Sequence, residues 1–290
     1  MDISVVTMYA ITPCHAGSGS SLGVVDLPIQ RERASNWPVI QASGVKGAFR
    51  ANFDKYKNQI SEKKEQVKDF NKLTESIFGT SEGSGYAGSL SVSDAKILAY
   101  PMRSNISPFI WITCPSVLKR LARDLEFAGK ITDAQNVKIP EIKGTEAQII
   151  FNVSEGKVLL EDYEVDVKGS FSIGELKPYL ERAERLILVS DDVFNYGVSD
   201  CTQIMAQIQI DSKTGTTKEG SLRYQEELPS DTIMYSVICW GDTKNSLEEN
   251  LKAGTIKNFV KDQVITTYIQ IAGDESCGRG IFKLDWNEKK

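Results

Sequence analysis

The stretch that most constrains the fold is residues 2–11, DISVVTMYAI. Its apolar and β-branched residues occupy both alternations of an extended chain rather than one. A strand with this pattern is covered on both faces, which is typical of a position inside a sheet. We therefore predict that the chain begins with a central strand.

Helix and strand patterns follow along the rest of the chain. SGVKGAFRANFDKY starts at Ser43, a residue type that favours the N-cap, and its apolar residues recur at helical spacing. Strands are expected at 90–98, 109–113, 148–153, 157–167, 203–210, 232–240 and 264–273, and further helices at 61–78, 115–129, 175–187 and 243–262. The first part is thus β-α-β and the last part β-β-α-β, which predicts an α+β protein built on ferredoxin-like sheets.

Composition limits the class of protein. The chain has 290 residues, 41% of them hydrophobic and 25% charged, as in an ordinary globular protein. It has no run of about 18 apolar residues. Its N-terminus has no basic region, so we expect a cytoplasmic protein without a membrane span or signal peptide. Five scattered cysteines without a C-x-x-C pair, and one histidine, argue against a zinc site and indicate reduced thiols.

Charge is distributed unevenly along the chain. A net charge of −5 argues against non-specific coating of nucleic acid. Between residues 12 and 50, however, basic residues outnumber acidic ones: Arg31, Arg33, Lys46 and Arg50 stand against Asp26 and Glu32. Any binding of nucleic acid should therefore be confined to one face.

The first candidate site is the loop CHAGSGSSLGVVDLPIQRE, which holds the only histidine, His15, and also Asp26. Glycines let backbone amides approach a ligand and form an anion-binding concavity. The loop lacks the G-K-[ST] ending of a P-loop and the spacing of a dinucleotide fingerprint, so it does not predict a nucleoside-triphosphate site. From these residues alone, a plain mobile loop in which Asp26 caps a turn is the favoured interpretation.

The second candidate site is SGVKGAFR, residues 43–50. A helix N-terminus offers free N–H groups and partial positive charge, and Lys46 and Arg50 are four residues apart, on one helical face. Each glycine here costs about 1 kcal/mol relative to alanine. Gly44 and Gly47 therefore favour a phosphate clamp over a merely solvated helix face.

Two later segments are polar and contain glycine. Residues 211–229, DSKTGTTKEGSLRYQEELP, form the tip of a long hairpin, which either contacts a partner by wedging side chains between bases or is a simple surface hairpin. Residues 271–284, IAGDESCGRGIFKL, place Gly278, Arg279 and Gly280 between two strands. This is either a tight turn that presents an arginine or a turn alone.

Together, TPCHAGSGSSLGVVDLPIQRE, PVIQASGVKGAFR, TGTTKEGSLRYQEELP and GDESCGRG resemble one family. They are similar to the RAMP superfamily of CRISPR-associated proteins and, within it, to the backbone subunits of the type III-B (Cmr-type) RNA-silencing complex. The resemblance covers nearly the whole chain. The S-x-x-K-G-x-x-R element and the last glycine-rich loop mark the superfamily broadly, whereas the loop with His15 and Asp26 and residues 215–229 are more specific.

The resemblance implies a single domain over residues 1–290. It would be a modified ferredoxin-like, RNA-recognition-motif-like palm with inserted helical fingers and a β-hairpin thumb. The expected boundaries are about 1–60, 88–113 and 190–290 for the palm, 61–87 and 114–189 for the fingers, and 211–230 for the thumb. Separately from the resemblance, the Gly/Ser-rich stretch GTSEGSGYAGS, residues 79–89, predicts a flexible link and a candidate insertion boundary.

The resemblance also implies a function. Copies of the chain would stack in a helical filament along one CRISPR RNA, with other Cmr-complex subunits, and each thumb would displace a base pair between guide and target RNA. The target RNA would be cut beside each displaced base with a divalent metal, Mg²⁺ or Mn²⁺. Asp26 matches the family's cleavage residue and is the expected metal ligand. The expected RNA contacts are Ser43, Lys46, Arg50, Arg31, Thr216, Lys218, Gly278 and Arg279.

RNA supplies its own nucleophile, the 2′-OH, so cleavage requires alignment, removal of a proton and stabilisation of charge. Asp26 would bind the metal or accept the proton. Histidine is a side-chain type that suits acid–base exchange, but phosphate contact or loop packing explains His15 equally. Glu226 and Glu227 of a thumb are further candidates for metal ligation.

Two other functions remain open on the sequence. A non-catalytic scaffold would bind guide RNA and leave the cutting to another protein. An enzyme acting on a small phosphorylated molecule would use the glycine-rich loops in a closed pocket, and it would purify without RNA.

Overall fold

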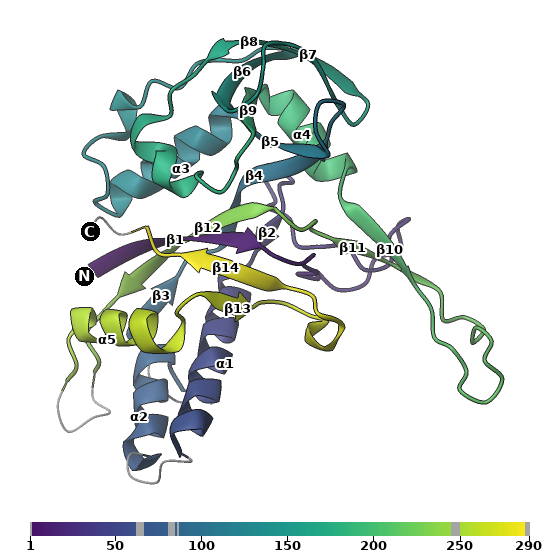
Figure 1. Cartoon of the computed structure of the whole chain (residues 1–290). Helices are drawn as coiled ribbons and strands as arrows, with labels where there is room; N and C mark the ends of the chain where they lie inside the picture. The colour runs from purple at the N-terminus through teal and green to yellow at the C-terminus, as the bar shows by residue number, and fades with distance from the viewer. Residues whose placement is uncertain (1, 62–66, 81–84, 86, 245–249, 288–290) are drawn as a thin grey trace.

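The computed structural model describes residues 2–61, 67–80, 85, 87–244 and 250–287. The fold is α+β, as predicted, and Figure 1 shows three parts. The palm contains β1 (Asp2–Ala10), β2 (Val39–Ile40), β3 (Leu90–Val92), β4 (Ala95–Arg103), β12 (Ile233–Trp240), β13 (Tyr268–Gln270) and β14 (Ile281–Asp285), with α1 (Ala42–Ser61), α2 (Val67–Phe78) and α5 (Ala253–Phe259).

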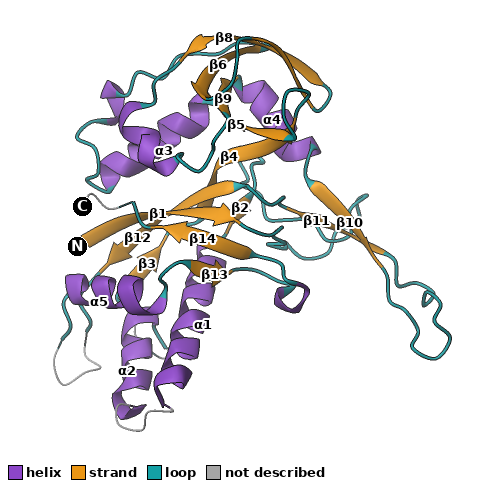
Figure 2. Cartoon of the chain, in the orientation of Figure 1, coloured by secondary structure: helices purple, strands orange, loops and turns teal. Residues whose placement is uncertain are grey.

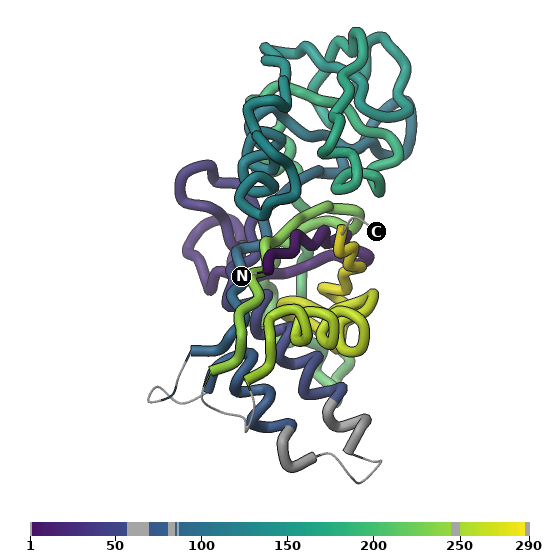
Figure 3. The backbone as a smooth tube through the Cα atoms, turned by 90° about the vertical axis from the view of Figure 1, so that its left-hand side faces the viewer, coloured from purple at the N-terminus to yellow at the C-terminus, as the bar shows by residue number. Residues whose placement is uncertain are grey.

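The upper unit is the second part. It contains β5 (Phe109–Thr113), β6 (Glu146–Phe151), β7 (Gly156–Leu160), β8 (Tyr163–Ser170), β9 (Leu186–Val189), α3 (Pro115–Phe127) and α4 (Asp191–Asp200), with short 3₁₀ turns η1 (Ala134–Asn136) and η2 (Gly174–Tyr179). The thumb is the third part, formed by β10 (Gln203–Gln207), β11 (Arg223–Glu227) and the tip at 208–222. Figure 3 shows the upper unit, the palm sheet and the two long helices arranged one after another.

β1 is the central palm strand that the sequence predicts. It pairs antiparallel with β12 on one side and with β14 on the other. Val5, Val6 and Met8 have no exposed surface, although they alternate between the two faces of the strand. The prediction of a strand covered on both faces is confirmed.

β4 joins the palm to the upper unit. Its first half pairs with β12 at Ile97 and Ala99, and its second half pairs with β5 from Tyr100 to Arg103. One continuous sheet therefore runs in the order β13-β14-β1-β12-β4-β5-β9-β6-β8-β7. Helices lie below the palm sheet and within the upper unit (Figure 2).

α1 packs on the palm as its periodicity predicts, but its start differs from the prediction. Val45, Phe49 and Phe53 are fully buried along one helical face. The helix begins at Ala42, and the carbonyl of Gln41 accepts the first bonds from within the helix. Ser43 is therefore not the N-cap. Instead, Asp94 Oδ1 accepts the N–H of Ala42 at 2.7 Å, so a distant carboxylate satisfies this helix end.

Two predicted helices are wrong in part. At 175–187 the chain forms the short turn η2 and then β9, because Pro178 interrupts a helix and the run Leu186–Val189 is buried beside β5. The helix predicted over 243–262 begins only at Ala253, where Asp242 accepts the backbone N–H. Residues 245–249 of that prediction lie outside the described residues, as do 62–66 of the helix predicted at 61–78 and residues 81–84 and 86 of the predicted link at 79–89.

Two further differences concern the upper unit. The strand predicted at 157–167 is a hairpin, β7 and β8, which turns at Glu161 with a positive φ of 51°. The helix α4 was not predicted; its N-cap is Ser190, whose hydroxyl accepts the N–H of Val193. Within the part of the chain that the structure describes, no helix is both long and apolar enough to cross a membrane.

Candidate nucleic-acid interface

The loop that holds His15 and Asp26 forms an arm that leaves the palm and returns to it. Its two limbs are joined at Gly17 and Ile29, and the N–H of Gln30 donates to the carbonyl of Ala16 at 2.7 Å. Leu22 and Val24 at the tip are fully exposed. The returning limb runs beside β11, to which a bridge between Leu27 and Gln225 joins it.

Asp26 lies where the arm meets the root of the thumb. Its Oδ2 accepts the backbone N–H of Tyr224 at 2.7 Å. Among the described residues, no group bonds to Oδ1. The next residue, Leu27, exchanges backbone bonds with Tyr224 and Glu226. The carboxylate is thus fixed to β11 through one oxygen, and the other oxygen stays available.

His15 contacts the same strand. Its Nδ1 lies 2.7 Å from the carbonyl oxygen of Glu226. Because a carbonyl can only accept, we assign the ring proton to Nδ1, which leaves the lone pair on Nε2. Backbone N–H and C=O groups of residues two apart in a strand point to the same edge, about 7 Å apart. His15 bonds to the backbone of Glu226 and Asp26 to that of Tyr224, so the two candidate catalytic residues lie along the same edge of β11.

Gly17 is required for this position of His15. A Cβ added at residue 17 would lie 2.6 Å from His15 Nε2. Such an approach is too close for any side chain. The glycine therefore keeps the Nε2 edge of the ring open, a role that its place in a Gly/Ser-rich loop does not reveal.

Arg31 and Glu226 form an ion pair beneath the arm. Arg31 Nη2 lies 2.6 Å from Glu226 Oε1, and their side chains are 17% and 7% exposed. Glu226 also accepts from the hydroxyl of Thr202 and the N–H of Ile29, and Arg31 also donates to the carbonyls of Asn36 and Val198. Both side chains are thus used inside the protein, where they join the arm to the thumb.

A second buried pair holds the last glycine-rich loop. Arg279 Nε donates to Glu227 Oε1 at 3.0 Å, and Glu227 is 1% exposed. Gly278 and Gly280 both have φ of 72°, and a Cβ at residue 280 would lie 2.0 Å from the carbonyl oxygen of Ile271. This loop also donates from Gly280 to the carbonyl of Pro13, which places it against the start of the arm.

The candidate phosphate clamp lies on the first turns of α1. Ser43 is exposed, and Lys46 is partly buried with no partner among the described residues. Burial lowers the pKa of Lys46 from its ordinary value, and neighbouring Arg50 lowers that pKa further. Arg50 donates to the carbonyl of Gly79 at 3.0 Å, at the end of α2, so it already has an internal role.

A groove of about 340 Å³ lies between α1 and the segment before the glycine-rich loop, and the residues that line it do not include Lys46 or Arg50. Its floor on α1 consists of Gly44, Gly47, Ala48 and Ala51, and its other wall includes Gln270 and Glu275. Nothing in the protein lies within 4 Å of a Cβ at Gly47. Internal packing therefore does not require this glycine, but the approach of an external backbone would.

The thumb tip is exposed. Thr216 and Lys218 lie on it, and their only recorded bonds are within the tip. Exposed apolar side chains follow the thumb from root to tip: Ile204, Ile208, Ile210, Leu222 and Tyr224. The thumb thus offers apolar and cationic groups to a partner.

A metal site is not complete within the described residues. They contain no group of three or more His, Cys, Asp or Glu side chains that could hold a metal ion. The carboxylates of Glu226 and Glu227, considered as ligands from the sequence, are engaged in the two buried pairs. This leaves Asp26 Oδ1 as the one oxygen that the candidate site offers a cation.

Comparison with known proteins places the chain in a family. The RAMP superfamily model matches residues 7–283, so this protein belongs to the RAMP superfamily. The CRISPR system Cmr endoribonuclease Cmr4 of Pyrococcus furiosus is 36% identical, over 99% of this chain and 97% of that one. The CRISPR system CMR subunit Cmr4 of Saccharolobus solfataricus is 22% identical, over 96% and 94%.

Solved structures show the same fold. The crystal structure of oligomeric Cmr4 from Pyrococcus furiosus superposes with a TM-score of 0.70 at 28% identity, over 100% of both chains. A chain of the type III-B Cmr-beta complex bound to cognate target RNA superposes with a TM-score of 0.76 at 21% identity, over 99% of this chain and 97% of that one. The expected palm with a projecting thumb is confirmed.

Proposed function

We propose that the protein is a backbone subunit of a type III-B CRISPR effector complex, which binds CRISPR RNA and cleaves the paired target RNA. The names of its relatives support this function: a Cmr endoribonuclease, an oligomeric Cmr4 and a Cmr-beta chain with target RNA. The observation that carries the proposal is the position of Asp26, bonded to the backbone of Tyr224 at the root of the thumb. The carboxylate and the thumb therefore reach the RNA together.

The guide RNA would follow the groove beside α1. Gly44 and Gly47 leave room for a sugar-phosphate backbone in this groove. Lys46 does not line the groove, but it lies on the same first turns of α1 and has no internal partner among the described residues. Ser43 and the turn Gly278-Arg279 border the same side of the palm. Contacts to phosphate and the 2′-OH are independent of base sequence, so base pairing would select the target.

The side chains at the thumb root have separate roles in this proposal. Asp26 Oδ1 accepts a proton from the 2′-OH or binds a cation beside the scissile phosphate. His15 holds its Nδ1 proton on the carbonyl of Glu226, so its Nε2 is the atom that exchanges a proton. Arg31 and Glu226 hold the arm in place through their ion pair.

The metal belongs to the same proposal. Mg²⁺ and Mn²⁺ prefer carboxylate, phosphate and water oxygens. Asp26 would hold the ion through Oδ1, and RNA phosphates and water would supply the other ligands. A bound cation would neutralise the phosphate charge that develops during cleavage.

We also propose a division of the chain into palm, fingers and thumb. It departs from the expected boundaries at α2, which packs against α1 through Phe53 and Phe70, and at β5 and α4, which we assign to the upper unit. β4 and β5 mark the passage from palm to upper unit, and α4 leads back to the thumb. The thumb would then include β10 and β11 as well as residues 211–230, because those strands pair with each other apart from the main sheet.

The variant Asp26→Asn tests the proposal in a complex reconstituted with guide and target RNA. An asparagine side-chain oxygen can still accept the N–H of Tyr224, so the arm should stay in place while the negative charge is lost. We expect target cleavage to fall by at least about 100-fold, the lower range for a lost acid–base group, with unchanged target binding. Asp192→Asn, an exposed aspartate in the first turn of α4, is the matched control.

Undiminished cleavage by Asp26→Asn would remove this residue from the chemistry and favour the non-catalytic scaffold. Addition of EDTA to the wild-type complex tests the metal separately. Cleavage that continues in EDTA would contradict metal dependence without affecting the role of Asp26.

A further inference from the structure

A cleft of about 780 Å³ lies at the seam between the upper unit and the palm, away from the thumb. From the upper unit, it is lined by Lys130, just after α3, and by Tyr179, at the end of η2. From the palm, it is lined by Lys257 of α5 and by Asn287, which follows β14. None of these residues takes part in the RNA-binding groove or the site at the thumb root.

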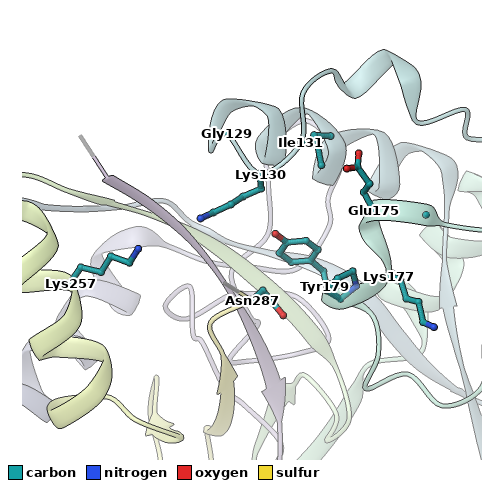
Figure 4. Close-up of a pocket in the computed structure, with 10 residues that line it drawn as sticks. Gly129, Lys130, Ile131, Glu175, Lys177, Tyr179, Lys257 and Asn287 are labelled. Atoms are coloured by element: carbon teal, nitrogen blue, oxygen red, sulfur yellow. The ribbon is translucent and has the colours of Figure 1, made fainter. Parts of the chain in front are cut away.

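Tyr179 indicates that the cleft receives a hydrogen-bond acceptor. Its side chain is nine-tenths buried, with 6% of the residue exposed, and its hydroxyl points into the cleft (Figure 4). Within the described ranges, no group is recorded as a partner for that hydroxyl. Burial raises the pKa of Tyr179 to about 12, so the group stays a neutral donor. The hydroxyl is not one of the buried polar atoms without a partner, so it reaches the open space of the cleft, where a ligand oxygen can accept its hydrogen bond.

Two lysines in the cleft favour an acceptor that carries a negative charge. Figure 4 shows the side chains of Lys130 and Lys257 pointing toward one another from opposite walls, with the Lys130 ammonium between the Lys257 ammonium and the Tyr179 hydroxyl in this view, whereas Lys177 points away. Lys257 is 12% exposed and forms an ion pair with Asp2 at 3.2 Å. The described residues include no ion pair to Lys130. An anionic oxygen would therefore meet the unpaired Lys130, the paired Lys257 and a neutral donor, in a cleft that Glu175 also lines.

The size and walls of the cleft indicate the rest of the ligand. Ligand pockets usually span about 300–1,000 Å³, so this cleft exceeds what a lone phosphate needs. Ile131, Pro178 and the ring of Tyr179 provide apolar surface for a sugar and a base. An adjoining groove that shares Pro178 and Asn287 with the cleft is also lined by Glu181 and Glu184. Their carboxylates would repel the further phosphates of a longer RNA strand.

We propose that this cleft binds a free nucleotide, with its phosphate between Lys130, Lys257 and the Tyr179 hydroxyl. The acidic groove beyond Asn287 limits the site to a short ligand and disfavours a continuous RNA strand. The proposal stands independently of RNA cleavage, because the thumb root and the α1 groove contribute nothing to the site.

Calorimetric titration of the full chain with AMP and ATP at low salt tests this site. We expect saturable binding that weakens with added salt. Tyr179→Phe removes only the hydroxyl, and Lys130→Gln removes only the charge; each should weaken binding by about 5–10-fold, the effect of one hydrogen bond or charge contact. Lys138→Gln, an exposed lysine outside the cleft, should bind like the wild type.

Two further titrations identify the source of the phosphate. Inorganic phosphate should bind more weakly than AMP, and a single-stranded RNA should bind the wild type and both variants equally. The proposal is overturned by an absence of nucleotide binding, by variants that bind as the wild type does, or by free phosphate binding as tightly as AMP. Loss of RNA binding in the variants would instead assign the cleft to RNA.

Discussion

The root and the tip of the thumb differ in how they use their charged residues. At the root, the carboxylates of Glu226 and Glu227 are buried and paired with Arg31 and Arg279. At the tip, Lys218 is exposed and has no recorded ion pair. The root is built as a fixed platform, whereas the tip keeps its groups for a partner. Basic residues near an RNA path therefore include structural ones, and only the partners in the fold distinguish them.

The largest effect on stability should come from the root of the thumb. Glu226→Ala leaves the guanidinium of Arg31 partly buried without its carboxylate, and we expect the free energy of unfolding to fall by about 3–5 kcal/mol. Glu219→Ala, at the exposed tip, should change it by less than about 0.5 kcal/mol. Urea denaturation of the two variants measures the difference. Equal stabilities would mean that the root is no more rigidly built than the tip.

A glycine pair sharpens the same comparison. Gly280 and Gly215 have similar positive φ values, 72° and 69°, but only a Cβ at Gly280 would collide with backbone, at Ile271. Gly215→Ala should cost about 1–2 kcal/mol for its backbone conformation. Gly280→Ala should cost about 1–3 kcal/mol more, because the loop must also move. Thermal denaturation that ranks the two variants in the opposite order would contradict the packing at the root.

The smallest effect concerns a residue free to bind RNA. Lys46→Ala should reduce the slope of log binding constant against log salt by about 0.7, the value for one phosphate contact on a single strand. Replacing Arg50 as well would also remove its bond to Gly79, so the single variant isolates the RNA contact. Filter binding of single-stranded RNA at several salt concentrations gives the slope, with Lys138→Ala as the control. An unchanged slope would place Lys46 off the RNA path.

Local patterns predicted the parts of the fold whose burial follows from nearby residues. The apolar run of β1 predicts that both of its faces are buried. The helical spacing of Val45, Phe49 and Phe53 predicts the buried face of α1. The helix predicted over 175–187 is wrong because only the spacing of its residues suits a helix. Pro178 and the pairing of β9 with β5 determine its structure instead. That pairing depends on a strand far away in the sequence.

The candidate site was predictable in its parts but not in its connections. The loop motifs and the family resemblance pointed to Asp26, Lys46 and the turn at Gly278. No local signal indicated that the backbone N–H of Tyr224 would bind the Asp26 carboxylate. Nor did any indicate that Asp94, and not Ser43, would accept a backbone N–H at the N-terminus of α1. Contacts of this kind join residues separated by dozens to hundreds of positions, so they require the folded chain.

The nine residues of β4 have a mechanical consequence. One half of the strand is hydrogen-bonded to β12 and the other half to β5, so neither sheet can come apart without disturbing the other. The palm and the upper unit should consequently melt in a single cooperative transition rather than as two separate domains. The walls of the seam cleft would then keep their spacing until the whole molecule unfolds.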